Sequence, residues 1–488
     1  MKHGRSRRRT RPARIPMIVG GVLWLLGGGS SLVAQEGADV PSTDGGATEP
    51  SSGAARAAEE VREITLDEAL ETTLVRSPAL DQARATVQTA AAQRLGSWGG
   101  YLPDVSFGYG YSRSSGSGRL DPTGQTITNQ SYSSQLRSSL TLFDGFGRER
   151  DLESARLGVQ AAETDYDARR FDALLQVKTA FYNAVAGQDR VTVEQDRVAR
   201  QEEQLEFVRQ QIRVGQATRS DTLRTRVDLN SARLALLEAE NQARAAEFSL
   251  AESMGVTERV RPVPEETLDT APLSLEREAL VRFAVDRAPE IRTADLDVAA
   301  AEAGVSAARS TYWPSLSVSG GMDWRNNTFP PGNGSWSFSV SGSIPVFNGL
   351  QRETGVDRAQ AQAYQARAQH RAAELAVRSE TQNAYDQIET ALAGLELAEE
   401  SVEAAEEDLR VTQQRFRLGV ATTLDLRSAE IALRQAEVDL IRRRFDYQVG
   451  IARLESLLGM ELEEVHAAAT SGRALPSATD AMETDAIE

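Results

Sequence analysis

Long stretches of the chain place an apolar residue at every seventh position. From Gly147 to about Arg213 there is no proline and little glycine. An apolar seam runs through these 67 residues at Val177, Ala184, Val191, Val198, Leu205 and Ile212. One helix of this length would extend about 100 Å at ~1.5 Å per residue. That exceeds an ordinary globular helix and is typical of a coiled coil, and the seven-residue period predicts a left-handed supercoil.

The heptad pattern recurs in the second half of the chain and in the segments that follow each long helix. The second seam comprises Ile388, Leu395, Val402, Leu409 and Phe416. The following segments carry Leu229, Leu236, Ala243 and Leu250, and then Leu424, Ile431, Val438, Phe445 and Ala452. A further stripe beside the last one consists of Leu426, Leu433, Leu440, Tyr447 and Leu454. Two adjacent stripes let one helix pack on both sides, as a closed tube of helices requires.

Two stretches, 101–143 and 312–347, are instead rich in serine, glycine and aromatic residues and alternate with period two. The pattern predicts strands at about 103–113, 132–143, 314–325 and 335–346. The last is clearest, with Trp336, Phe338, Val340 and Ile344 alternating with serines. Runs of about ten residues with one apolar face are typical of transmembrane β-strands. Aromatic residues gather near the loop-side ends, at Tyr109, Tyr111, Tyr132, Trp324 and Trp336.

A half-buried strand of a soluble sandwich would alternate in the same way. Four strands are too few for a sandwich, and they are also too few for a membrane barrel, which needs at least about eight. We therefore expect the strands to be pooled between chains. Two chains would supply about eight strands and three chains about twelve.

The chain consists of two copies of one pattern. Pro78, Tyr101 and Pro103 recur 211 positions later, whereas ten residues from Phe143 to Gly255 recur 204 positions later. The offset changes once, by seven residues, which indicates a surface loop of variable length between the strands of each copy. We expect this loop at about 112–130 in the first copy and 326–334 in the second.

Each pair of long helices turns at a glycine that is followed by a threonine and an aspartate. The turns are Arg213-Val214-Gly215-Gln216-Ala217-Thr218 and Arg417-Leu418-Gly419-Val420-Ala421-Thr422. Glycine suits the left-handed residue after a helix. Ser220, or Thr422 with Thr423, is expected to cap the next helix, with Asp221 and Asp425 in its first turn. Each aspartate therefore stabilises a helix start or lines a pore, and the sequence leaves both roles open.

The amino-acid composition excludes several kinds of site and of chemistry. The net charge is −17 and there is no cysteine, which excludes disulfides, thiolate metal sites, a cysteine nucleophile and a lipid-anchored cysteine. The three histidines lie far apart, and no nucleophile, metal or cofactor constellation is visible, so we expect no enzyme and no cofactor. No segment has 18 consecutive apolar residues, so a membrane-spanning form must use β-strands.

The N-terminus is typical of a secretory signal, with seven basic residues, the apolar run 17–26 and a cleavage site near Ala34. A membrane anchor is the alternative, although the apolar run is about half the ~20 residues that a spanning helix needs. Removing seven positive charges from −17 leaves −24, which argues against a nucleic-acid partner. The expected organisation is a signal peptide at 1–34, a disordered linker at 35–62, repeat 1 at 63–256, a linker at 257–272, repeat 2 at 273–460 and an acidic disordered tail at 461–488.

Taken in order, these motifs resemble the TolC-like outer membrane efflux family over about residues 63–460. The carriers are Leu-Pro at 102–103, Trp-Pro at 313–314, Phe-Asp-Gly at 143–145, Phe-Asn-Gly at 347–349 and the Gly-to-Asp turns at 215–221 and 419–425. The resemblance implies a mainly α fold with β-strands, in which a homotrimer pools its strands into a 12-stranded barrel continued by a periplasmic helical tunnel. It also implies a passive exit duct in the outer membrane of a Gram-negative-type cell. Its partners would be a periplasmic adaptor (membrane fusion) protein and an inner-membrane pump of a tripartite efflux or type I secretion system.

In the family, the helix-turn tips hold the closed entrance and meet the adaptor. By position, the implied gate residues are Asp221, Ser220, Phe416, Arg417, Asp425 and Ser428, and the implied docking residues are Arg213, Gly215, Thr218, Gly419 and Thr422. The chain departs from well-studied relatives, with Ala421 in place of an arginine, Phe416 in place of a tyrosine and Ser428 in place of a second acid. Arg417 or Arg213 is a candidate replacement for the missing arginine.

Two other functions remain as alternatives. A structural or adhesive coiled-coil protein of the envelope would explain the heptads but not the strands. A periplasmic adaptor would have one helical hairpin between two half-motifs of a β-domain, not two full copies. Acidic residues from Glu396 to Asp408, together with the net charge, predict a duct that prefers cations.

Overall fold

The computed structural model describes residues 61–120, 126–264, 276–332, 334–460 and 462. The predicted signal peptide, nearly all of the predicted 35–62 linker and nearly all of the acidic tail lie outside these residues. The described residues belong to one unit.

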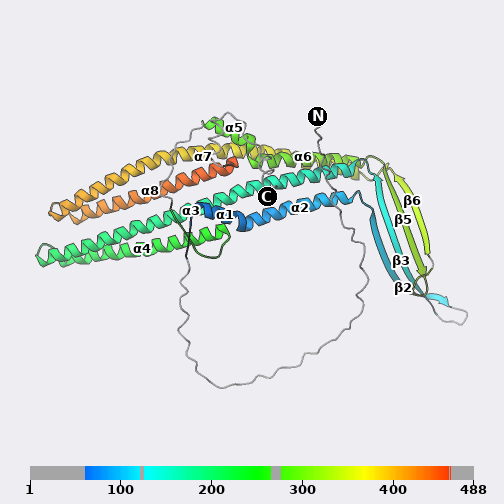
Figure 1. Cartoon of the computed structure of the whole chain (residues 1–488), viewed down its shortest axis with the longest axis horizontal. Coiled ribbons are helices and arrows are strands. Elements are labelled where there is room, and N and C mark those ends of the chain that lie inside the picture. Colours follow the sequence, from blue (N-terminus) through cyan, green and yellow to red (C-terminus); the bar gives the residue numbers. More distant parts are fainter. Residues whose placement is uncertain (1–60, 121–125, 265–275, 333, 461, 463–488) are drawn as a thin grey trace, which may run out of the picture. The chain divides into compact units, whose positions relative to one another are not determined.

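The elements occur in the same order in both halves of the chain (Figure 1). Repeat 1 contains α1 (Leu66–Arg76), α2 (Pro78–Gly99), β2 (Asp104–Leu120), β3 (Thr126–Phe143), α3 (Gly147–Arg213) and α4 (Arg219–Met254). Repeat 2 contains α5 (Arg277–Arg287), α6 (Pro289–Ser310), β5 (Ser315–Asn326), β6 (Gly334–Ser343), α7 (Gln351–Arg417) and α8 (Thr423–Leu458). The structure thus confirms two repeats, each with a strand pair and a long helical hairpin.

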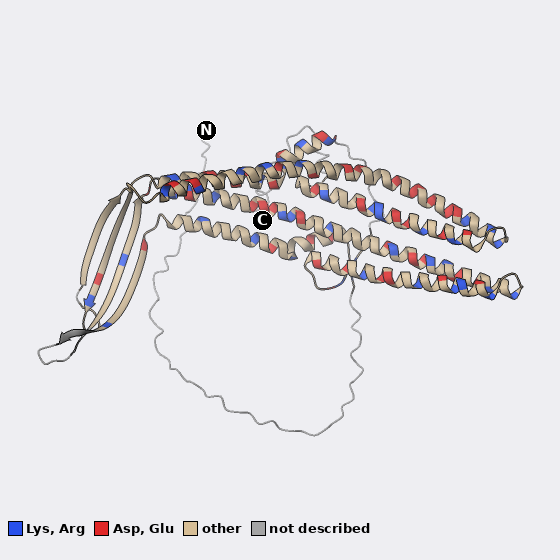
Figure 2. Ribbon diagram, turned by 180° about the vertical axis from the view of Figure 1, so that it is seen from behind, with Lys and Arg blue, Asp and Glu red and all other residues tan. Residues whose placement is uncertain are grey.

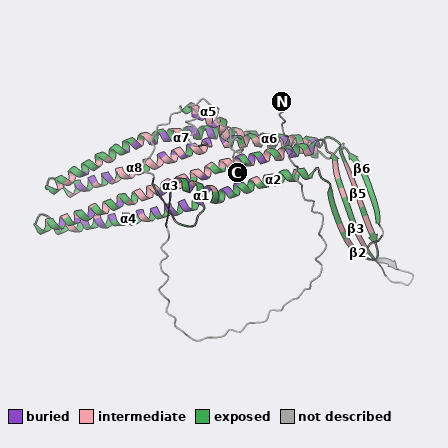
Figure 3. Cartoon of the chain, in the orientation of Figure 1, coloured by how far each residue is buried: buried purple, intermediate pink, exposed green. Residues whose placement is uncertain are grey.

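The long helices match the heptad prediction. Both α3 and α7 have 67 residues, and each packs along its following helix (Figure 1). Val177 and Ala184 on α3 and Ile388 and Leu395 on α7 are buried, and buried residues form stripes along the helices (Figure 3). Ile212, at the end of the first seam, is 37% exposed. No helix in the described ranges is both long enough and apolar enough to cross a membrane.

The four long strands form one antiparallel sheet in the order β2-β3-β5-β6. Its register places apolar residues opposite one another on one face, as with Val318 and Val340 or Met322 and Trp336. The opposite face carries a ladder of paired serine hydroxyls, at 3.1 Å, 3.0 Å and 2.8 Å for Ser315–Ser343, Ser317–Ser341 and Ser319–Ser339. The sheet carries few charged residues compared with the helices (Figure 2). One apolar and one small polar face is the arrangement that the alternation predicts.

The structure corrects the extent of the first strand pair and adds a second, short sheet. β2 and β3 continue through most of the predicted 112–130 loop, and they remain paired as far as Leu120 and Thr126. The second loop is as predicted, because β5 ends at Asn326 and β6 begins at Gly334. A parallel pair, β1 (Arg62–Ile64) and β4 (Val260–Pro262), was not predicted; β4 lies in the predicted 257–272 linker, and β1 lies at the predicted boundary between the first linker and repeat 1.

An arginine joins strand to helix at the start of each long helix. Arg148 donates hydrogen bonds to the carbonyls of Gly100, Thr141 and Leu142 and stacks 4.8 Å from the Tyr101 ring centre. Its counterpart Arg352 donates to the carbonyls of Pro345 and Val346 and stacks 4.9 Å from the Tyr312 ring centre. The planar guanidinium offers several donors in a fixed geometry, so one side chain satisfies carbonyls at the strand end and holds the helix beside it.

Candidate functional site: the helix-turn tips and the seam between the repeats

Each long helical hairpin turns through a glycine in the left-handed conformation. Gly215 has φ +78° and Gly419 has φ +74°. A residue with a Cβ is strained at these angles, so glycine is the residue that ends α3 and α7 here at least cost. Both turns are of the kind that the sequence predicts.

A reciprocal capping box starts each return helix. In the first tip, the Thr218 N–H and hydroxyl donate to Asp221 Oδ2 at 2.8 Å and 2.7 Å, and the Asp221 N–H donates back to Thr218 Oγ1 at 3.4 Å. In the second tip, Thr422 and Asp425 repeat the arrangement at 2.8 Å, 2.8 Å and 3.2 Å. Thr218 is therefore the cap of α4, and the prediction of Ser220 is wrong, because the capping box places the threonine three positions before the aspartate and Ser220 directly precedes Asp221.

These hydrogen bonds set the protonation of both aspartates. The backbone hydrogen bond from Thr218, followed by its hydroxyl, lowers the pKa of Asp221. The backbone and hydroxyl hydrogen bonds of Thr422 lower the pKa of Asp425 in the same way. Each carboxylate thus accepts hydrogen bonds from the threonine that caps its own helix. In the described residues, Asp425 has no ion pair with an arginine.

The remaining predicted residues make few contacts across the tips. Arg213 pairs with Glu206 of its own helix at 3.5 Å, and the Ser428 hydroxyl donates to the Leu424 carbonyl at 2.9 Å. The Phe416 ring lies 5.8 Å from that of Phe207, centre to centre, and this contact joins the two hairpins near their tips.

Large apolar side chains project from both turns, and the sequence prediction did not single them out as a surface. Val214, Leu418, Val420 and Leu424 are all exposed, with Leu418 at 79%. An exposed cluster of this kind is typical of a protein-binding surface. The signal was present in the sequence, since Val214, Leu418 and Val420 lie within the predicted turns and outside the heptad seams, and Leu424 follows the second turn.

A seam of polar contacts joins the two hairpins along α3 and α8. Each cluster of buried apolar residues in the described ranges lies within one repeat, whereas hydrogen bonds and ion pairs cross the seam. Among them are Lys178–Glu455 at 2.6 Å, Gln201–Glu430 at 2.7 Å, Ser456–Asp172 at 3.4 Å, Glu194–Arg434 at 3.7 Å and Arg200–Glu437 at 4.0 Å. Nearer the tips, Asp228 on α4 lies 3.6 Å from Arg427 on α8.

Burial along this seam raises the pKa of two of its carboxyl groups. Desolvation raises the pKa of Glu430, and the hydrogen bond from Gln201 opposes that shift. Desolvation also raises the pKa of Glu437, and Arg200 opposes it. The two seam carboxyl groups with a raised pKa therefore lie opposite Gln201 and Arg200 of α3.

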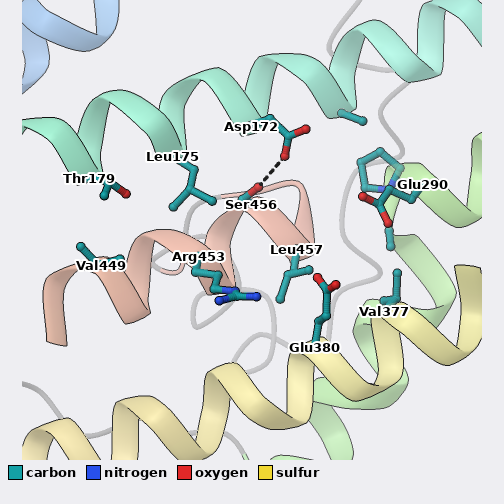
Figure 4. Close-up of a pocket in the computed structure, with 13 residues that line it drawn as sticks. Asp172, Leu175, Thr179, Glu290, Val377, Glu380, Val449, Arg453, Ser456 and Leu457 are labelled. Atoms are coloured by element: carbon teal, nitrogen blue, oxygen red, sulfur yellow. Dashed lines mark hydrogen bonds between the residues drawn. The ribbon is translucent and has the colours of Figure 1, made fainter. Parts of the chain in front are cut away.

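A cavity of about 340 Å³ lies where the seam reaches α6 and α7 (Figure 4). Leu175, Val377 and Leu457 form apolar parts of its wall. Glu290 and Glu380 also line it, and desolvation followed by repulsion from Glu380 raises the pKa of Glu290. Its lining is mixed, and in the described residues no group of three potential ligands could hold a metal ion.

Comparison with known proteins gives one family. The family model described as "Outer membrane efflux protein" matches residues 69–256 and 280–460. The chain is 30% identical over 383 residues to Protein CyaE of Bordetella pertussis, covering 76% of this chain and 79% of that protein. It is 24% identical over 404 residues to the pyoverdine export outer membrane protein OpmQ of Pseudomonas aeruginosa, covering 81% and 84%.

Solved structures show the same fold. A crystal structure of CusC matches with a TM-score of 0.70 at 19% identity, covering 81% of this chain and 92% of that one. The outer-membrane channel OprN matches with a TM-score of 0.68 at 23% identity, covering 82% and 90%.

Proposed function

The chain belongs to the outer membrane efflux protein family, and from this premise we propose that three copies form one continuous export duct. The chain is an outer-membrane channel that passes substrates to the exterior. The observation that carries the pooling of strands between copies is the four-stranded sheet, which has an apolar face and, in the described residues, no strand partner at the outer edges of β2 and β6. Three such sheets supply the twelve strands of one barrel, and the helical hairpins continue it as a periplasmic tunnel.

The helix-turn tips are the proposed periplasmic entrance and docking site. Arg213, Gly215, Thr218, Gly419 and Thr422 lie in the two turns, and the exposed apolar residues around them offer a surface for a periplasmic adaptor, which in turn joins an inner-membrane pump. The gate residues are Phe416, with Asp221, Ser220, Arg417, Asp425 and Ser428. Since both aspartates cap helices, the ring contact of Phe416 with Phe207 supports a gate closed by packing more than by arginine–carboxylate pairs.

The duct is proposed to prefer cations. The seven acidic residues from Glu396 to Asp408 on α7 are all exposed, and the chain carries a net charge of −17. A wall of one sign of charge concentrates counter-ions in a confined channel. Relatives carry different cargoes by name, among them a pyoverdine export protein and a cation efflux system protein.

Reconstitution in a planar lipid bilayer tests the proposal. We expect discrete conductance steps and, under a KCl gradient, a reversal potential on the cation-selective side. Replacing Asp425 with alanine should reduce that preference if the carboxylates form a ring at the entrance. An unchanged preference would remove Asp425 from the pore. A protein that inserts but conducts nothing, or that selects anions, contradicts the proposed duct or its charge.

A further inference from the structure

The connections from the sheet to the long helices contain two large apolar residues in a left-handed backbone conformation. Phe146 has φ +66° and Leu350 has φ +65°, and they are the only residues other than glycine with a positive φ in the described part of the chain. They occupy equivalent places, each directly before the first residue of a long helix. A large side chain is costly at these angles, and an outlier of this kind points to a function of the side chain.

The Phe146 side chain does not hold the two repeats together. The glycines on either side of it are buried, and a Cβ at Gly145 or Gly147 would lie 2.6 Å or 2.7 Å from an atom of Ser310. Between them, Phe146 is 58% exposed, and Leu350 is also 58% exposed. The turn therefore directs the Phe146 side chain away from the contact with the second repeat.

Phe146 instead extends the apolar face of the sheet. Its ring lies 5.4 Å from that of Phe143, centre to centre, at an interplanar angle of 88°. Phe143 pairs in the strand register with Leu316, which lies on the same face of β5 as Val318. In the second repeat, Phe347 is the counterpart of Phe143 and is 79% exposed. The apolar face thus continues past the strand ends to the start of each long helix.

The same end of the sheet carries further exposed apolar residues. Trp98 and Leu102, which lead into β2, are 50% and 67% exposed, and Trp313, which leads into β5, is 60% exposed. Tryptophan combines an apolar ring with an N–H group and is enriched where lipid meets water. Charged residues follow Phe146 and Leu350 within two positions, on the long helices (Figure 2). The sheet therefore ends in an apolar band that gives way to charged residues within one helical turn.

We infer that Phe146 and Leu350 insert into the phospholipid surface of the periplasmic leaflet and fix the depth of the sheet in the outer membrane. The inference rests on the proposed duct, in which the apolar face of the sheet contacts lipid and the helices lie in the periplasm. Transfer of each side chain from water to the acyl chains offsets the cost of its left-handed backbone. The charged residues that follow stay in water, so the change from apolar to charged residues marks the membrane surface.

Site-directed spin labelling tests this depth, because the chain has no cysteine. Phe146→Cys and Leu350→Cys in the full chain are labelled with a nitroxide and reconstituted in vesicles of phosphatidylethanolamine and phosphatidylglycerol. Collision with oxygen, which concentrates in the bilayer, should exceed collision with a water-soluble nickel chelate at both positions. Phe338→Cys on the apolar face of the sheet is the lipid reference, and Glu203→Cys, at an exposed position of α3, is the water reference.

The references separate failure of the inference from failure of the duct. With Phe338→Cys in lipid, a label at Phe146→Cys or Leu350→Cys that meets the nickel chelate as often as Glu203→Cys overturns the inference and leaves the duct intact. A label that meets neither reagent is covered by protein and also overturns it. A label at Phe338→Cys that behaves like that at Glu203→Cys overturns the lipid-facing sheet and the proposed duct together.

Leu350→Asn separates the membrane contact from a role in the backbone turn. Asparagine adopts the left-handed conformation at lower cost than leucine, so a role in the turn alone predicts an equal or higher unfolding midpoint. Because the lipid contact is lost, the midpoint in the same vesicles should instead fall, by about 2 °C or more. A midpoint that is unchanged or raised overturns the inference.

Discussion

The ion pair between Lys178 and Glu455 is the shortest ion pair between the two repeats in the described residues and gives a measurable test of the polar seam. The Lys178 Nζ lies 2.6 Å from Glu455 Oε2, and the side chains are 18% and 14% exposed. Glu455 Oε1 also accepts the Leu462 N–H at 3.3 Å. The perturbation is a double-mutant cycle of Lys178→Met and Glu455→Met, in which methionine keeps most of the side-chain volume.

The expected size follows from this burial. Removing one member of a fully buried pair costs about 3–5 kcal/mol, whereas an exposed pair contributes about 0.2–1 kcal/mol. At this residual exposure we expect each single substitution to cost about 2 kcal/mol, because it leaves a poorly solvated charge. The double variant removes both charges and should cost less than the two singles together, with a coupling energy of about 1.5 kcal/mol.

The assay is guanidinium unfolding in detergent, followed by helical circular dichroism. The exposed pair Glu407–Arg410, at 58% exposure for both side chains, is the control and should show a smaller coupling. Additive costs at Lys178 and Glu455 would refute the reasoning, because they would mean that the repeats are not held together by this contact.

Three further predictions concern single positions. Burial raises the pKa of Glu430. The stability that this carboxyl group contributes is therefore fully present below its unfolded pKa of about 4.3 and is lost as pH rises through its folded pKa. Glu430→Gln should accordingly raise the free energy of unfolding more at pH 8 than at pH 5. Asp221 has a lowered pKa, so the stability that its carboxylate contributes is present above about pH 4 and is lost as pH falls through the folded pKa. Asp221→Asn should speed amide hydrogen exchange in the first turn of α4 at pH 7. Equal exchange rates would contradict the capping role. Gly145→Val and Gly349→Val both place a β-branched residue at a positive φ, +72° and +67°; because Gly145→Val also meets Trp313 within the chain, it should lower the unfolding midpoint more than Gly349→Val, and equal midpoints would contradict the contact.

The elements that repeat in sequence could be predicted, because periodicity and glycine placement act locally. The helix Gly147–Arg213 was predicted from the absence of proline and from heptads. The far ends of β2 and β3 could not be predicted, because this serine- and glycine-rich stretch has no alternation of apolar and polar residues, although its backbone is paired as far as Leu120 and Thr126. The three-residue strands β1 and β4 are too short to carry a pattern.

The candidate site was predicted in position but not in contacts. Gly215 and Gly419 mark both turns, and Asp221 and Asp425 lie in the first turns as expected. The polar α3–α8 seam could not be predicted, because Lys178 and Glu455 are 277 residues apart and heptads do not indicate which helices pack together. From sequence alone, a charged residue beside a heptad seam is predicted to face solvent, because its ion-pair partner on another helix is not known.

Electron cryomicroscopy of the detergent-solubilised full chain tests the central claim most directly. The account predicts a threefold particle in which three four-stranded sheets close one wall and six helix-turn tips lie together at the opposite end. A particle of one or two copies, or a sheet whose β6 edge has no partner strand, would contradict it.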